Sequence, residues 1–118
     1  MGTLKIYVKY SINEGVVTVM VVRAKIKIKN KSGLHARPAA IFINTCKQFK
    51  SNIKIIKQGR SADAKNMLQV LALGIDMGDE IIIEINGEDE KEALKTIIEL
   101  LEKKLPVLDK SIKLETLI

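Results

Sequence analysis

The fold of this chain is decided around residues 33–40, Gly33-Leu34-His35-Ala36-Arg37-Pro38-Ala39-Ala40, where a predicted strand gives way to a predicted helix. Proline disfavours helical backbone in the residue before it and is well tolerated in the first helical turn. We therefore predict that Pro38 is the first residue of the helix and that Arg37 is extended just outside it. His35, the only histidine of the chain, then lies in a loop at a helix start.

This helix start has the chemistry of an anion site. Its first backbone N–H groups lack helical acceptors, and the aligned peptide dipoles add about half a positive charge. We predict that the amides of Ala36, Arg37, Ala39 and Ala40 bind a phosphoryl group. The Arg37 guanidinium can donate two parallel hydrogen bonds to phosphate oxygens. Imidazole is a nucleophile, so His35 is a candidate to attack phosphorus.

These residues resemble a known active-site signature. Residues 33–39 are similar to the signature of HPr, the histidine phosphocarrier of the bacterial phosphoenolpyruvate-dependent sugar phosphotransferase system. A second run, residues 63–74, resembles the second helix of that family and lies at the family's spacing from the histidine: Asp63-Ala64-Lys65-Asn66-Met67-Leu68-Gln69-Val70-Leu71-Ala72-Leu73-Gly74. The resemblance covers roughly residues 22–105.

The resemblance implies a function. His35 would accept a phosphoryl group from phospho-Enzyme I, through the ring nitrogen nearer the backbone, and donate it to sugar-specific A components. Arg37 would hold the group. The protein would be a carrier with a stoichiometric phosphohistidine rather than an enzyme, and we expect no metal and no cofactor.

Two other functions remain open, and so does the interpretation that His35 has no function at all. The chain could be a regulatory HPr paralogue that binds partners such as carbon-regulatory proteins and transfers little phosphate. It could instead be a basic nucleic-acid-binding module, or His35 could be an ordinary surface histidine at a loop-to-helix junction.

Charge and aromatic content bear on which kind of partner the protein binds. The formal net charge of +6 indicates an acidic partner, but aromatic residues make up 3% of the chain and tryptophan is absent. Stacking platforms for single strands need aromatic side chains, so we expect protein partners and no nucleic acid.

Composition also indicates a compartment. Cys46 is the only cysteine, so no intramolecular disulfide can form, and we predict that it lies on the buried stripe of a helix. No apolar run approaches the roughly 20 residues that span a bilayer, and the first residues do not have the pattern of a signal peptide. We expect a cytoplasmic protein without direct membrane insertion.

Hydrophobic periodicity predicts an α+β fold: an open-faced β-sandwich with a four-stranded antiparallel sheet covered on one face by three helices. The fold that the resemblance implies is the same. The chain is long enough for one compact domain, residues 22–105, with extensions at residues 1–21 and 106–118. Strands are predicted at residues 22–29, 51–57 and 80–85, and a turn at residues 58–61 leads into a further short strand that ends near residue 64. The helices are predicted at residues 38–49, 67–73 and 89–104, with Pro106 ending the last helix.

The extensions are predicted to be strand-like. Residues 3–10 alternate apolar and polar side chains, residues 13–15 suit a turn, and residues 16–22 are a β-branched run. That run either extends the following strand or pairs with the first as a hairpin. Residues 110–118 also alternate, and the two ends could pair within one chain or across a homodimer.

Apolar residues left over from the core predict a docking surface. Ala40 and Ile41 lie toward the outer side of the first helix, and Met67, Leu68 and Leu71 exceed what the core of the second helix needs. The family resemblance supports this interpretation, because the family presents the matching helix to its partners.

Asn66 departs from the family pattern. Many HPr proteins have a serine here that a dedicated kinase phosphorylates. Asparagine can still cap the second helix but offers no hydroxyl, which puts this regulation in doubt. Ser32 and Ser61 are nearby hydroxyls at positions that do not match.

Overall fold

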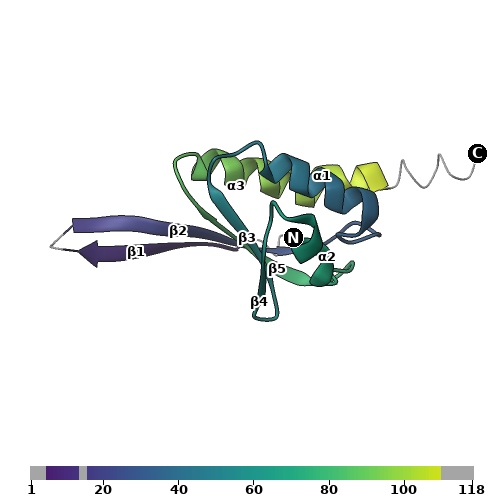
Figure 1. Cartoon of the computed structure of the whole chain (residues 1–118), viewed down its shortest axis with the longest axis horizontal. Helices are drawn as coiled ribbons and strands as arrows, with labels where there is room; N and C mark the ends of the chain where they lie inside the picture. Colours follow the sequence, from purple (N-terminus) through teal and green to yellow (C-terminus); the bar gives the residue numbers. More distant parts are fainter. Residues whose placement is uncertain (1–4, 14–15, 110–118) are drawn as a thin grey trace, which may run out of the picture.

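One antiparallel sheet carries the fold. The computed structural model describes the backbone of residues 5–13 and 16–109 and the side chains of residues 22–109. Five strands follow the order β1-β2-β5-β3-β4 in the sheet, and Figure 1 shows the helices gathered on one side of it. The strands are β1 (Lys5–Asn13), β2 (Val16–Lys27), β3 (Asn52–Lys57), β4 (Arg60–Asp63) and β5 (Glu80–Asn86).

The first two strands form a long hairpin. β1 pairs with β2 from Lys5 opposite Lys25 to Asn13 opposite Val16, with a bulge between Lys9 and Tyr10. β2 reaches β5 only from Val22 onward, so its first part pairs with β1 alone and projects from the sheet as a ribbon (Figure 1). The β-branched run therefore does both things the sequence left open: it extends β2 and pairs with β1. The predicted strand at residues 110–118 lies outside the described residues.

Strict alternation in the central strands creates the core. In β3, in β5 and in β2 from Val22 onward, every second residue points to the helices and is buried, while its neighbours face the open side. The predicted open-faced α+β fold is confirmed, with β1 added at one edge. The inward residues of these strands are Val22, Ala24, Ile26, Ile53, Ile55, Ile81, Ile83 and Ile85.

Three helices cover the inward face: α1 (Ala36–Cys46), α2 (Met67–Ala72) and α3 (Glu90–Glu99). α1 contributes Ala39, Phe42, Ile43 and Cys46, all buried, as the predicted stripe requires. Burial raises the pKa of the Cys46 thiol to about 12, outweighing a smaller lowering effect of Lys65. Cys46 is thus a core residue with an inert thiol, as predicted.

The bounds of α1 differ from the prediction. The helix begins at Ala36 rather than Pro38, and Ala36 itself has a left-handed φ of 48°, which turns the chain into the helix. Proline disfavours a helical Arg37 but does not forbid it. The helix also ends at Cys46, and tighter turns follow in which Phe49 N–H donates to the Cys46 carbonyl.

Pro106 does not end the last helix, contrary to prediction. α3 continues as a π-helical turn, η1 (Leu100–Lys104), and residues 105–109 are helical again. In this turn Leu105 N–H donates to the carbonyl of Leu100, five residues earlier. The wider turn interrupts the i−4 bonding pattern just where Pro106 lacks an N–H, so the chain stays helical past the proline. Among the described helices, none is long and apolar enough to cross a bilayer.

Candidate functional site

The loop before α1 is tightly built. Gly33 has a φ of +58°, and a Cβ there would lie 2.3 Å from the carbonyl oxygen of Ile75. The Asn30 side-chain amide donates to the Gly33 carbonyl at 2.6 Å, and Leu34 N–H donates to Ile75 O at 3.0 Å. Only glycine fits this left-handed, backbone-to-backbone position. These contacts fix the backbone of residues 33 and 34, and therefore the position from which His35 follows.

His35 is the N-cap residue of α1. Its backbone is extended, with φ −122° and ψ 159°, and its side chain makes no capping hydrogen bond. The imidazole is 42% exposed, and its Nε2 lies 2.8 Å from Oδ1 of Asp76. The ring is thus reachable by a partner and is oriented by one carboxylate.

Sequence reasoning missed Asp76. It stands 41 residues from His35, in the loop between α2 and β5, and no local pattern links the two residues. The one available signal is the spacing between residues 33–39 and residues 63–74, which matches the HPr family and predicts that the end of the second helix lies close to the histidine loop. The carboxylate of Asp76, which follows the second helix, could have been considered on that ground.

The early start of α1 changes which amides are open. Ala39 N–H donates to the His35 carbonyl at 3.4 Å, and in a helix that begins at Ala36 the N–H of Ala40 bonds within the helix. The prediction of open amides at Ala39 and Ala40 is therefore wrong. Ala36 and Arg37 occupy the positions whose N–H groups lack helical acceptors.

Arg37 stands on the exposed side of this start. Its side chain has no ion-pair partner within residues 22–109. A guanidinium two residues from His35 is available to an arriving anion.

The predicted docking residues are distributed unevenly. On α2, Leu68 is 81% exposed, and Met67 and Leu71 are about half as exposed. On α1, Ala40 is half-buried and Ile41 packs partly against the core. Met77, which sequence reasoning did not single out, is exposed in the loop that carries Asp76.

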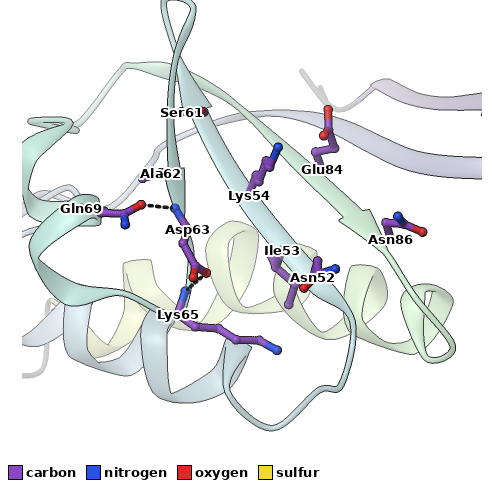
Figure 2. A pocket seen from close by; sticks show the side chains of 10 residues that line it. All are labelled: Asn52, Ile53, Lys54, Ser61, Ala62, Asp63, Lys65, Gln69, Glu84 and Asn86. Atoms are coloured by element: carbon purple, nitrogen blue, oxygen red, sulfur yellow. Dashed lines mark hydrogen bonds between the residues drawn. The ribbon is translucent and has the colours of Figure 1, made fainter.

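Asn66 caps α2 as predicted. Its side-chain oxygen accepts from Gln69 N–H at 3.2 Å. Gln69 in turn accepts from Asp63 N–H at 2.8 Å, so the start of α2 is tied to the end of β4 (Figure 2).

The segment after Pro106 fastens the histidine loop. Asp109 is buried, and its carboxylate accepts from Ser32 N–H at 2.6 Å, from Ser32 Oγ at 2.8 Å and from Asn30 Nδ2 at 3.3 Å. Burial by itself raises the pKa of Asp109, but the hydrogen bonds from Ser32 and Asn30 outweigh burial and leave that pKa below its ordinary value. An ionised Asp109 is therefore part of the loop's support.

A polar hollow of about 440 Å³ lies elsewhere, between β3, β4, β5 and α2 (Figure 2). Its Lys65 ammonium is already committed to the carbonyls of Phe49 and Ser51, at 2.6 and 2.8 Å. Within the described part of the chain, no group of three or more histidine, cysteine or acidic side chains could hold a metal ion. The start of α1 remains the candidate functional site.

Comparisons with known proteins bear on this site. The family model described as the PTS HPr component phosphorylation site matches residues 22–103. The HPr-like protein Crh of Halalkalibacterium halodurans is 38% identical over 82 residues, 70% of this chain and 98% of that protein. The phosphocarrier protein HPr of Buchnera aphidicola is 42% identical over 71 residues, 60% of this chain and 84% of that protein.

Solved structures agree. HPr from Thermoanaerobacter tengcongensis has a TM-score of 0.69 and 40% identity, over 70% of this chain and 93% of that one. An HPr dimer from the same organism has a TM-score of 0.58 and 41% identity, over 68% and 92%. Because the family match spans well over half of the 118 residues, the chain belongs to the HPr family.

Proposed function

We propose that this protein is a phosphocarrier that accepts a phosphoryl group on His35 from phospho-Enzyme I and donates it to sugar-specific A components. The observation that carries the proposal is the His35 ring, exposed at a helix start whose first amides are open and whose next charged residue is Arg37. Membership of the HPr family supports it.

The transfer exchanges one phosphorus–nitrogen bond for another. The donor is a phosphohistidine on Enzyme I. A ring nitrogen of His35 forms a bond to its phosphorus while the phosphorus–nitrogen bond to the donor imidazole breaks, and the electron pair of that bond returns to the donor ring. Arg37 and the amides of Ala36 and Arg37 offset the charge of the phosphoryl oxygens. An open site of this kind holds the group weakly enough for the reverse step to deliver it onward, and the carrier is regenerated unchanged.

Docking would use the apolar surface of α2. Met67, Leu68 and Leu71 are exposed on the helix next to the histidine loop, and the partly exposed Ala40 and Ile41 lie on α1, which begins at that loop. An apolar surface beside a charged site suits protein partners that must bind and leave quickly. The proposal places the exchange in the cytoplasm.

The decisive experiment supplies phosphoenolpyruvate and Enzyme I and follows the intact mass. A stoichiometric, acid-labile gain of one phosphate is expected, and His35→Ala should abolish it. Circular dichroism should show that His35→Ala remains folded, since the exposed ring contributes little packing. A phosphate gain that survives in His35→Ala would contradict the assignment.

A regulatory paralogue is the second candidate, favoured by the similarity to the HPr-like protein Crh. Such a protein would bind carbon-regulatory partners and transfer little phosphate. The same experiment separates the two: a folded wild-type protein that gains no phosphate favours the paralogue. Steep salt-dependent binding to mixed DNA would instead support a nucleic-acid module.

We also propose that the terminal extensions can pair two copies. β1 is an edge strand of the described sheet, and edge strands offer backbone groups for a further strand. Light scattering should give a dimer mass for the full chain and a monomer mass after removal of residues 1–15. A monomer mass for the full chain would exclude the dimer.

A further inference from the structure

We infer that Asp76 is a positioning residue for the transfer proposed above: its carboxylate holds the His35 proton on Nε2 and thereby presents Nδ1 to the incoming phosphorus. The inference rests on the proposed function of His35. It starts from the 2.8 Å contact between His35 Nε2 and Asp76 Oδ1.

Asp76 is held in place by its own loop. Its N–H donates to Oδ2 of Asp79 at 2.8 Å, and its carbonyl accepts from Asp79 N–H at 3.1 Å. Asp79 also pairs with the Lys57 ammonium at 2.8 Å, and that ammonium donates to the Gly74 carbonyl at 2.7 Å. Hydrogen bonds donated by the Asp76 amide and by the Lys57 ammonium lower the pKa of Asp79, so this carboxylate is ionised at neutral pH.

The Asp76 loop and the His35 loop are joined directly. Leu34 N–H donates to Ile75 O, so the residues just before His35 and Asp76 are hydrogen-bonded to each other. Gly33 packs against the backbone of Ile75 and Asp76 with no room for a side chain. These backbone contacts therefore hold the His35 and Asp76 side chains, which are 42% and 72% exposed, within hydrogen-bonding reach of each other.

The contact selects a tautomer. A neutral imidazole has one N–H and one nitrogen with a free electron pair, and an ionised carboxylate can only accept a hydrogen bond. Nε2 therefore carries the proton and donates to Asp76, and the free electron pair is on Nδ1. Of the two ring nitrogens, Nδ1 is the one nearer the backbone.

The proton need not move during the transfer. The Nδ1 electron pair forms the new bond to phosphorus while the donor's phosphorus–nitrogen bond breaks and its electron pair returns to the donor ring. The His35 ring then bears phosphorus on Nδ1, a proton on Nε2 and a positive charge that faces the Asp76 carboxylate. Onward donation returns the electron pair to Nδ1, and Nε2 keeps its proton throughout.

The first test reads the tautomer and needs no phosphate donor. Because His35 is the only histidine, ¹⁵N-histidine labelling gives the signals of this ring alone. The wild type should be almost entirely protonated on Nε2 at a pH where the ring is neutral. Asp76→Ala should give a mixture of tautomers, whereas Asp76→Asn should keep the wild-type tautomer because its amide oxygen can accept the same bond. Glu99→Ala, a matched loss of an exposed carboxylate on α3, should leave the tautomer unchanged.

The second test measures single-turnover transfer from phospho-Enzyme I. Asp76→Ala should slow transfer about fivefold to tenfold, the size expected for one exposed charge-assisted hydrogen bond, with Asp76→Asn much closer to the wild type. An unchanged tautomer or an unchanged rate in Asp76→Ala would overturn the inference. If the wild type itself accepts no phosphate, the proposed function fails and the transfer role of Asp76 fails with it, while the tautomer still reports the hydrogen bond.

Discussion

The starts of α1 and α2 are held in opposite ways. α2 caps itself: the Asn66 side chain accepts from Gln69 N–H within the same turn. The residue at the same position of α1 is His35, which makes no capping bond and points its ring to Asp76 instead. The start of α2 satisfies one of its amides with its own cap, whereas the start of α1 has no side-chain cap.

The open start is supported from outside. Asp109, 77 residues from Ser32, bonds to the loop before α1, and Gly33 packs against the loop after α2. Remote support leaves the His35 ring and the amides of Ala36 and Arg37 unoccupied. The difference shows how a helix start can be both well fixed and available to a ligand.

The largest loss of stability is expected from a side chain at Gly33, which would disrupt the backbone contact between the loop before α1 and the loop after α2. Gly33→Ala would bring a Cβ within 2.3 Å of Ile75 O in a left-handed backbone, and should lower the free energy of unfolding by more than about 3 kcal/mol. Gly74→Ala is the matched control, because Gly74 has a similar φ of +61° but nothing within 4 Å. Urea denaturation measures both variants. Equal losses would mean that the close approach at Gly33 does not matter.

Breaking the remote support should have the next largest effect. Asp109→Asn replaces an acceptor of three hydrogen bonds by a group that also carries donors, and should lower the free energy of unfolding by about 1–3 kcal/mol. Chemical denaturation measures it, with Glu92→Gln, an exposed change on α3, as control. If the two variants unfold at the same urea concentration, Asp109 does not support the loop.

Acid should remove the same support. The pKa of folded Asp109 lies below its ordinary value of 3.8, so the folded state favours the ionised form. This contribution is complete above the unfolded pKa and is lost as the pH falls through the folded pKa. The stability difference between the wild type and Asp109→Asn should therefore be constant near neutral pH and shrink below about pH 4. A difference that grows on acidification would have the wrong sign.

The smallest effect is expected from a change to the cap of α2. This change should affect stability but not phosphate transfer. Asn66→Ala removes the side-chain acceptor at the start of α2 and should lower the free energy of unfolding by about 1 kcal/mol, whereas Asn66→Ser should stay close to the wild type. Thermal denaturation measures stability, and the phosphate-gain experiment should detect no loss of transfer. A loss of transfer in a folded Asn66→Ala would show that this cap also serves His35.

Local patterns predicted most of the fold. Alternation identified β2, β3 and β5 together with their buried faces, and the stripe Ala39, Phe42 and Cys46 identified the packed side of α1. Helix ends were less predictable. Ala36 takes a positive φ and the π-helical turn bypasses the missing N–H of Pro106, and both depend on contacts that a short window of sequence does not contain.

The sequence by itself determined which residues could do chemistry: a single histidine, an arginine two residues later, and a proline that places both at a helix start. Only the tertiary structure decided how they are arranged. The Asp76 carboxylate reaches His35 from 41 residues away, and Asp109 reaches Ser32 from 77 residues away. Hydrophobic periodicity specifies a buried face, but a polar contact between two loops depends on how the layers pack, so it exists only once the sheet and helices have closed around the core.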